Sequence, residues 1–271
     1  MRKDTGKYLI TMLLTLLLSA CSKGVFDVQL KTYEATDTVS PVLKNDGLQG
    51  AMQCIADVRL ILLSADTLSE HYAGASRINR YIIDELLDGC RNASETEAAQ
   101  QFVRISSKLL ADDMQTMYGE RDEDFDAVFT RRVTTEAHWG FGDNVLCYTL
   151  TNDLYEGGAH PVTQTCTLSF SIENGCVIRP SDVFREGTED MLIERLTNSL
   201  MEQYDVEFVD ELHEMGILDL SDMYISDDML LESDGIVFHY DPYELAPYAL
   251  GSIDIRLSYT EVEDLLRSTE P

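Results

Sequence analysis

The feature that most limits the possible folds is a strict alternation of apolar and polar residues in the second half of the chain. Residues 164–172 place apolar side chains such as Leu168 and Phe170 on one side and threonine or serine on the other. A period of two is typical of a β-strand with one apolar face. Asn174-Gly175 follows and is a strong hairpin signal. The pattern predicts antiparallel strands joined by tight turns.

The same reasoning predicts the other elements. Further strands are expected at 53–64, 128–137, 144–151, 176–178, 229–232, 236–240 and 253–259. The polar residues from 22 to about 48 are expected to form a tether and an entry strand. Apolar residues at helical spacing predict helices at 77–88, 94–114, 189–204 and 260–263. Gly89 is placed for a C-cap, and Ser94 with Glu97 forms a capping box. Helices packed on a largely antiparallel sheet define an α+β fold.

The first 20 residues have the layout of a signal peptide. Three basic residues precede an apolar run at 8–18, which is shorter than the roughly 20 residues that a membrane-spanning helix needs. The run ends in Leu-Ser-Ala-Cys at 18–21, which resembles the bacterial lipobox. We expect cleavage before Cys21 and anchoring through two or more acyl chains on this cysteine, which hold a protein firmly on a bilayer. The alternative is an ordinary secretory signal followed by a chance cysteine.

The charge of the chain restricts its partners. The formal charge is −29, and removing residues 1–20, which contain three basic residues and one acidic residue, leaves −31. Such a surface repels nucleic-acid phosphates and anionic lipid headgroups, so we expect no nucleic-acid partner. It favours solubility, and it speeds the encounter with a cationic protein.

The cysteines do not form a dense disulfide framework. Five remain besides Cys21, an odd number, and none forms a Cys-x-x-Cys pair, which argues against thiol–disulfide exchange. An exported compartment permits disulfides, and at most two bridges can form. The pairing stays open among Cys54, Cys90, Cys147, Cys166 and Cys176.

Known catalytic and metal-binding motifs each lack a required residue. The glycines at 140–142 lack the third glycine of a dinucleotide loop, and His213-Glu214 lacks the second histidine of a metalloprotease helix. The acidic run at 122–126 is followed by Ala127, where a calcium loop needs glycine. His138 lies beside Trp139 and is interpreted as a packing histidine. We expect no catalytic residue, no cofactor and no metal.

The segment at 151–161, with the sequence Thr-Asn-Asp-Leu-Tyr-Glu-Gly-Gly-Ala-His-Pro, combines a glycine turn with His160. Glycines let the backbone approach another element closely. The segment also resembles the signature of the RsiV-type extracytoplasmic domain, a domain of unknown function in the lysozyme-sensing anti-sigma-V factor and in PdaC-type peptidoglycan deacetylases. Similar agreement occurs at 179–184, 234–238 and 240–251. Together these motifs cover about residues 128–267.

The resemblance implies an α+β fold and a place in the cell envelope. Residues 50–118 look more loosely like the small PdaC-like domain that precedes the RsiV-type domain. We expect neither sigma-factor control nor deacetylation, because the sequence shows no sigma-binding segment with a spanning helix and no deacetylase catalytic domain. In the anti-sigma factor this domain binds lysozyme, a strongly basic protein, which the acidic charge here would suit. The expected segments are a signal peptide (1–20), a tether (21–48), a PdaC-like α/β subdomain (49–120) and an RsiV-type domain (121–271).

These observations lead to a functional hypothesis. The chain is expected to be a non-enzymatic lipoprotein of the bacterial envelope, on the periplasmic face or the cell surface, that binds a cationic, lysozyme-like protein or a cell-wall glycan. Tyrosines with a polar tip suit recognition surfaces. The candidate contact residues are Tyr155, Gly157, Gly158, His160, Tyr243 and Tyr248. Two alternatives remain open: a glycan hydrolase or deacetylase that uses His160, and a structural component of a surface complex.

Overall fold

The computed structural model describes residues 27–41, 52–118, 126–219 and 221–267. The predicted signal peptide, Cys21 and most of the acidic run at 122–126 lie outside these residues. Among the described residues, no helix is long and apolar enough to cross a membrane.

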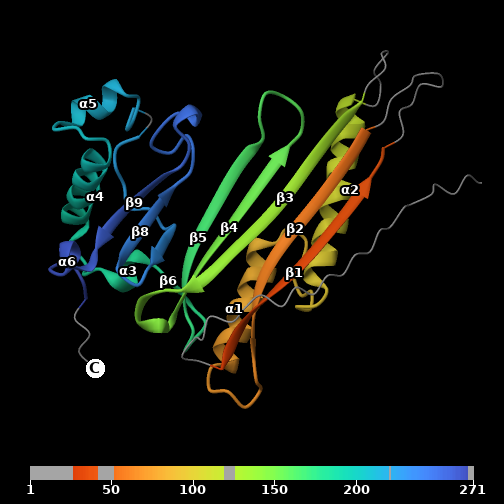
Figure 1. Ribbon diagram of the computed structural model, residues 1–271, viewed down its shortest axis with the longest axis horizontal. Helices are drawn as coiled ribbons and strands as arrows, with labels where there is room; N and C mark the ends of the chain where they lie inside the picture. Colours follow the sequence, from red (N-terminus) through yellow and green to blue (C-terminus); the bar gives the residue numbers. More distant parts are fainter. Residues whose placement is uncertain (1–26, 42–51, 119–125, 220, 268–271) are drawn as a thin grey trace, which may run out of the picture.

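A six-stranded sheet forms the larger part of the molecule (Figure 1). Its strands lie in chain order: β1 (Val28–Val39), β2 (Met52–Ala65), β3 (Ala127–Trp139), β4 (Val145–Tyr155), β5 (Val162–Ser171) and β6 (Val177–Ile178). All neighbours are antiparallel except β2 and β3. Parallel neighbours need a crossover connection, and helices between β2 and β3 supply it. The predicted α+β class with a largely antiparallel sheet is confirmed.

The crossover helices cover one face of this sheet. They are α1 (Tyr72–Tyr81), the π-helical turn η1 (Ile82–Leu86) and α2 (Ala98–Tyr118). Apolar residues at helical spacing, including Ile78, Ile82 and Phe102, are completely buried against β2 and its neighbours. Asn79 is also buried, and its amide bonds both the N–H and the carbonyl of Leu63, at 2.8 and 2.7 Å. This pairing ties α1 to the end of β2.

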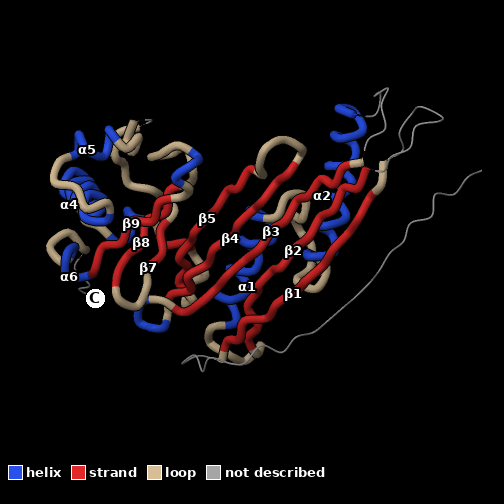
Figure 2. The backbone as a smooth tube through the Cα atoms, turned by 45° about the horizontal axis from the view of Figure 1, so that its top comes forward, coloured by secondary structure: helices blue, strands red, loops and turns tan. Residues whose placement is uncertain are grey.

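A second, three-stranded antiparallel sheet follows, in the order β7 (Met229–Leu231), β8 (Gly235–Tyr240), β9 (Ile253–Ser258). It has its own hydrophobic core, to which the leucine stripe of one helix, at 192, 196 and 200, contributes. Figure 2 shows this sheet beside β5, with helices on its far side. Helices α4 (Glu189–Gln203), α5 (Val209–Glu214) and α6 (Tyr259–Val262) lie there, preceded in the chain by the short helix α3 (Pro180–Val183). The short turns η2 (Phe141–Asp143) and η3 (Tyr248–Leu250) connect β3 to β4 and β8 to β9.

The helices and strands differ from the sequence expectations mainly in the residues at which they begin and end. The helix expected at 77–88 begins at Tyr72, and Gly89 has the positive φ of 74° expected after a helix end. Within the expected tether, Val28–Val39 is a strand paired with β2 along its whole length. The expected boundary at residue 120 falls inside the large sheet, because β2 pairs with β3. The second core takes most of its residues from Ile178 onward, but Val145 and Cys147 of β4 also belong to it.

The five described cysteines are free thiols. Burial raises the pKa of Cys54 and Cys90 to about 11 and the pKa of Cys147 and Cys166 to about 12. Because a thiol reacts as the thiolate, these four side chains are unreactive at neutral pH in the metal-free protein, where they act as small packing groups. Cys176 is exposed.

Candidate binding site

The site begins at an incomplete strand edge. β5 pairs with β4 along its length but with β6 at only two positions. Carboxylates of residues that flank β7 and β8 complete the edge. The N–H of Thr165 donates to both oxygens of Asp241 at 3.0 Å, and the N–H of Thr167 donates to Asp228 at 2.7 Å. A hydrogen bond to a charged acceptor is stronger than one between neutral groups. Two carboxylates therefore replace a neighbouring strand.

Ser169 continues this connection. Its hydroxyl donates to the carbonyl of Met229 at 3.1 Å and accepts from the N–H of Leu231 at 2.8 Å. The hydroxyl side of β5 is therefore covered by β7, and Thr167 and Ser169 are buried. The alternation predicted which residues share a face of β5, and the structure shows that both faces are covered near this point.

His239 holds the carboxylates in place. It lies on β8 and is 7% exposed. Its Nδ1 is 2.6 Å from the carboxylate of Asp254, and its Nε2 is 3.3 Å from that of Asp241. Burial alone would lower the pKa of His239, but the hydrogen bonds and charges of Asp254 and Asp241 outweigh burial and raise the pKa above its usual value. Protonated His239 donates to both acids.

Asp241 also starts a tight turn that directs Tyr243 into solvent. The Asp241 N–H donates to the Glu244 carboxylate at 2.6 Å, and the Tyr243 N–H donates to the Ala246 carbonyl at 2.8 Å. Tyr243 has a φ of 75° and is 61% exposed. A bulky residue in this left-handed conformation costs about 1–3 kcal/mol and persists only where its surroundings impose it. The hydrogen-bonded turn therefore holds the exposed ring of Tyr243 in a fixed position.

Three predicted contact residues meet at this turn, and we call His160, Tyr243 and Tyr248 the aromatic rim. The rings of His160 and Tyr248 stack with centroids 3.9 Å apart and planes at 15°. The ring of Tyr243 lies 5.9 Å from that of Tyr248. The Tyr248 hydroxyl donates to the Pro161 carbonyl at 3.2 Å and joins the two loops. The rim thus combines the β4–β5 loop with the loop between β8 and β9.

The other predicted contact residues shape the β4–β5 loop. Tyr155 donates to the Gly158 carbonyl at 3.1 Å, across the turn. Gly157 and Gly158 have φ values of 91° and 119°, which only glycine adopts readily. A Cβ on Gly157 would lie 3.1 Å from the hydroxyl of Tyr118 at the end of α2. These residues position His160, while the rim rings face outward from the loop.

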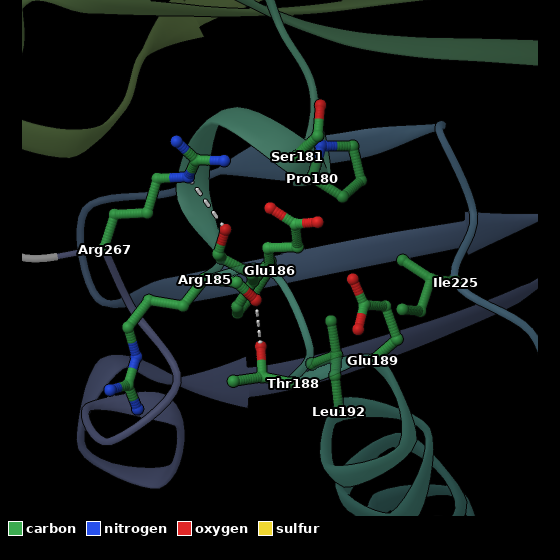
Figure 3. A pocket seen from close by; sticks show the side chains of 10 residues that line it. Pro180, Ser181, Arg185, Glu186, Thr188, Glu189, Leu192, Ile225 and Arg267 are labelled. Atoms are coloured by element: carbon green, nitrogen blue, oxygen red, sulfur yellow. Dashed lines mark hydrogen bonds between the residues drawn. The ribbon is translucent and has the colours of Figure 1, made fainter.

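The structure also contains a pocket that the sequence did not predict. A pocket of about 300 Å³ opens between the α3–α4 connection and the segment that ends at Arg267 (Figure 3). Phe184, Leu192 and Ile225 form its apolar wall, and Arg267 closes one side by donating to the Phe184 carbonyl at 2.9 Å. Its residues come from three separate segments, so no local pattern identifies it. The motif at 179–184 supplies part of the lining, and its proline with Asp182 indicates only a helix start.

Comparisons with known proteins agree with this fold. Residues 181–260 match the family described as "Protein of unknown function (DUF3298)". A solved DUF3298-family structure from Bacteroides fragilis has a TM-score of 0.76 and 22% identity, covering 90% of this chain and 96% of its own. A DUF3298-family structure from Pseudomonas aeruginosa has a TM-score of 0.54 and 12% identity, covering 89% of this chain and 96% of its own. No curated protein matches.

The His239 cluster predicts how stability depends on pH. A histidine with a raised folded-state pKa contributes fully below its unfolded pKa of about 6.5, and the contribution is lost as the pH rises through the folded pKa. Urea unfolding of the wild type and His239→Gln at pH 6 and pH 8 should therefore show a larger loss of unfolding free energy in the wild type. Both proteins keep Asp228, whose pKa burial raises and the charge of His239 lowers, so the difference reports His239 together with its effect on Asp228. Equal losses in the two proteins would contradict the assignment.

Proposed function

We propose that this protein binds a cationic protein at the bacterial envelope through the aromatic rim, without carrying out chemistry itself. The observation that supports this most is the assembly of three aromatic rings from two distant segments at an exposed position. One of these rings is held on a strained backbone at Tyr243. Strain of this kind persists where it serves a site.

The chemistry of the rim suits a partner rich in lysine and arginine. The faces of tyrosine rings attract cations, and the attraction grows when water is excluded. The formal charge of −29 accelerates the approach of a cationic protein. The turn that carries Tyr243 also contains Asp241 and Glu244, which place negative charge beside the rings.

The resemblance to the RsiV-type domain supports the same choice of partner. His160 belongs to the motif at 151–161, and Tyr243 and Tyr248 belong to the motif at 240–251. The rim therefore consists of residues from both quoted motifs. A lysozyme-like protein is the specific partner class that we propose.

A glycan-processing reaction at His160 is the alternative, and the geometry favours it less. The Nδ1 of His160 lies 2.9 Å from the carbonyl of the next residue, Pro161, and its ring stacks on Tyr248. Within the described part of the chain, no carboxylate is hydrogen-bonded to this imidazole. General acid–base catalysis by histidine usually relies on such an orienting partner.

Calorimetric titration tests the binding proposal. The purified protein should bind lysozyme at micromolar concentration, and added salt should weaken binding because it screens charge. Tyr248→Ala should weaken binding by at least about 10-fold, as expected for a central aromatic contact. Tyr72→Ala, which removes an exposed tyrosine on α1, is the matched control and should bind as the wild type does.

Two outcomes would contradict the proposal. One is no binding at micromolar concentration, and the other is equal affinity in the two tyrosine variants. Binding of soluble peptidoglycan fragments but not of lysozyme would replace the protein partner by a glycan.

The envelope location depends on the lipid anchor at Cys21, which lies outside the described residues. Cys21→Ser should move the protein from the membrane fraction to the soluble fraction, because the acyl chains hold it at the bilayer. Cys176→Ser, which replaces an exposed cysteine in the folded part, should stay with the membrane. A Cys21→Ser protein that remains in the membrane fraction would rule out the anchor.

A further inference from the structure

His138, Cys147 and Glu232 meet at the end of β4 that is remote from the aromatic rim. His138 on β3 and Cys147 on β4 are directly opposed in the sheet, so their side chains lie on the same face. Glu232 directly follows β7 and comes from the second sheet. The sequence interpretation of His138 as a packing histidine did not anticipate this meeting, because Glu232 is 94 residues away.

The donor atoms of the three side chains lie close enough to share one ion. The Nε2 of His138 is 3.0 and 2.8 Å from the two carboxylate oxygens of Glu232. One donor atom from each residue lies within 4.8 Å of the others. Cys147 is completely buried, while the side chains of Glu232 and His138 are 18% and 51% exposed. The cluster is therefore closed behind the sulfur and accessible from the imidazole side.

The surrounding backbone holds the cluster in place. The Cys147 Sγ lies 3.3 Å from the Leu231 carbonyl, which fixes it against the end of β7. A Cβ on Gly140 would lie 2.6 Å from this sulfur and 2.1 Å from the Leu231 carbonyl oxygen, so only glycine permits the approach. The Tyr259 hydroxyl donates to the Glu232 carbonyl at 2.8 Å. The end of β7, the backbone at Gly140 and the side chain of Tyr259 thus hold Cys147 and Glu232 in place before any ligand binds.

We propose that His138, Cys147 and Glu232 bind a zinc ion. An imidazole nitrogen, a thiolate sulfur and a carboxylate oxygen are the three kinds of ligand that zinc accepts, whereas calcium and magnesium prefer oxygen alone. Three protein ligands leave the fourth position of a tetrahedral ion for water. Binding displaces the thiol proton of Cys147 into solvent, and no redox change occurs. The zinc ion links β3 and β4 to β7, and so joins the two sheets at a second place.

The inference is independent of the aromatic rim and has its own test. Chelator-treated protein should bind one zinc ion per chain in calorimetry, and cobalt(II) should give the near-ultraviolet absorption of a thiolate–cobalt bond. Zinc should raise the melting temperature, because a ligand that binds only the folded state stabilises it. Trp139, the only tryptophan in the chain, adjoins His138 and should change its fluorescence on binding.

Variants separate the proposed site from surface binding. Cys147→Ser should abolish the cobalt–thiolate absorption. His138→Gln, at an exposed position, removes a direct ligand and should weaken zinc binding by at least about 10-fold, the smallest loss that is typical even for an outer-shell partner. The controls Cys176→Ser and His213→Gln replace exposed residues elsewhere and should bind as the wild type does. Equal zinc affinity in His138→Gln and the controls would overturn the proposal. So would a wild-type protein that gives no thiolate–cobalt absorption.

Discussion

The arrangement of this molecule depends on how the outer edge of β5 is completed. An unpaired buried N–H costs about 1–3 kcal/mol, and an open strand edge invites pairing with other chains. The carboxylates of Asp241 and Asp228 accept from Thr165 and Thr167, where a further strand would otherwise pair. Since Asp228 directly precedes β7 and Asp241 directly follows β8, satisfying this edge also fixes the second sheet against the first. The contacts at this edge therefore connect the two sheets.

The position of the aromatic rim depends on the same contacts at the β5 edge. Asp241 is bonded to β5 and begins the turn that holds Tyr243 in its left-handed conformation. His239 links Asp241 to Asp254 and keeps two negative charges close together. The loop between β8 and β9 therefore reaches the β4–β5 loop at a fixed distance, at which Tyr248 stacks on His160. A site of this kind needs both sheets.

Local pattern predicts much of this fold and only part of the site. The alternation around Phe170, the hairpin signals and the spacing of Leu192 and its neighbours specify strands and helices because burial on one face imposes a period. The rim residues were identifiable because glycine turns and paired tyrosines stand out in one segment each. The acids at the β5 edge and the partners of His138 were not identifiable from the sequence, because their roles depend on contacts between residues more than 60 positions apart. The same holds for the pocket lined by Phe184.

The most direct test of this account is amide hydrogen exchange of β5, measured by nuclear magnetic resonance on the folded protein. Thr165 and Thr167 should exchange as slowly as Cys166 and Leu168, which belong to the ladder with β4. Asp241→Ala should accelerate exchange at Thr165 far more than at Thr167. Exchange at Thr165 and Thr167 as fast as that of a solvent-exposed edge amide in the wild type would show that the carboxylates do not complete the strand, and would contradict the account.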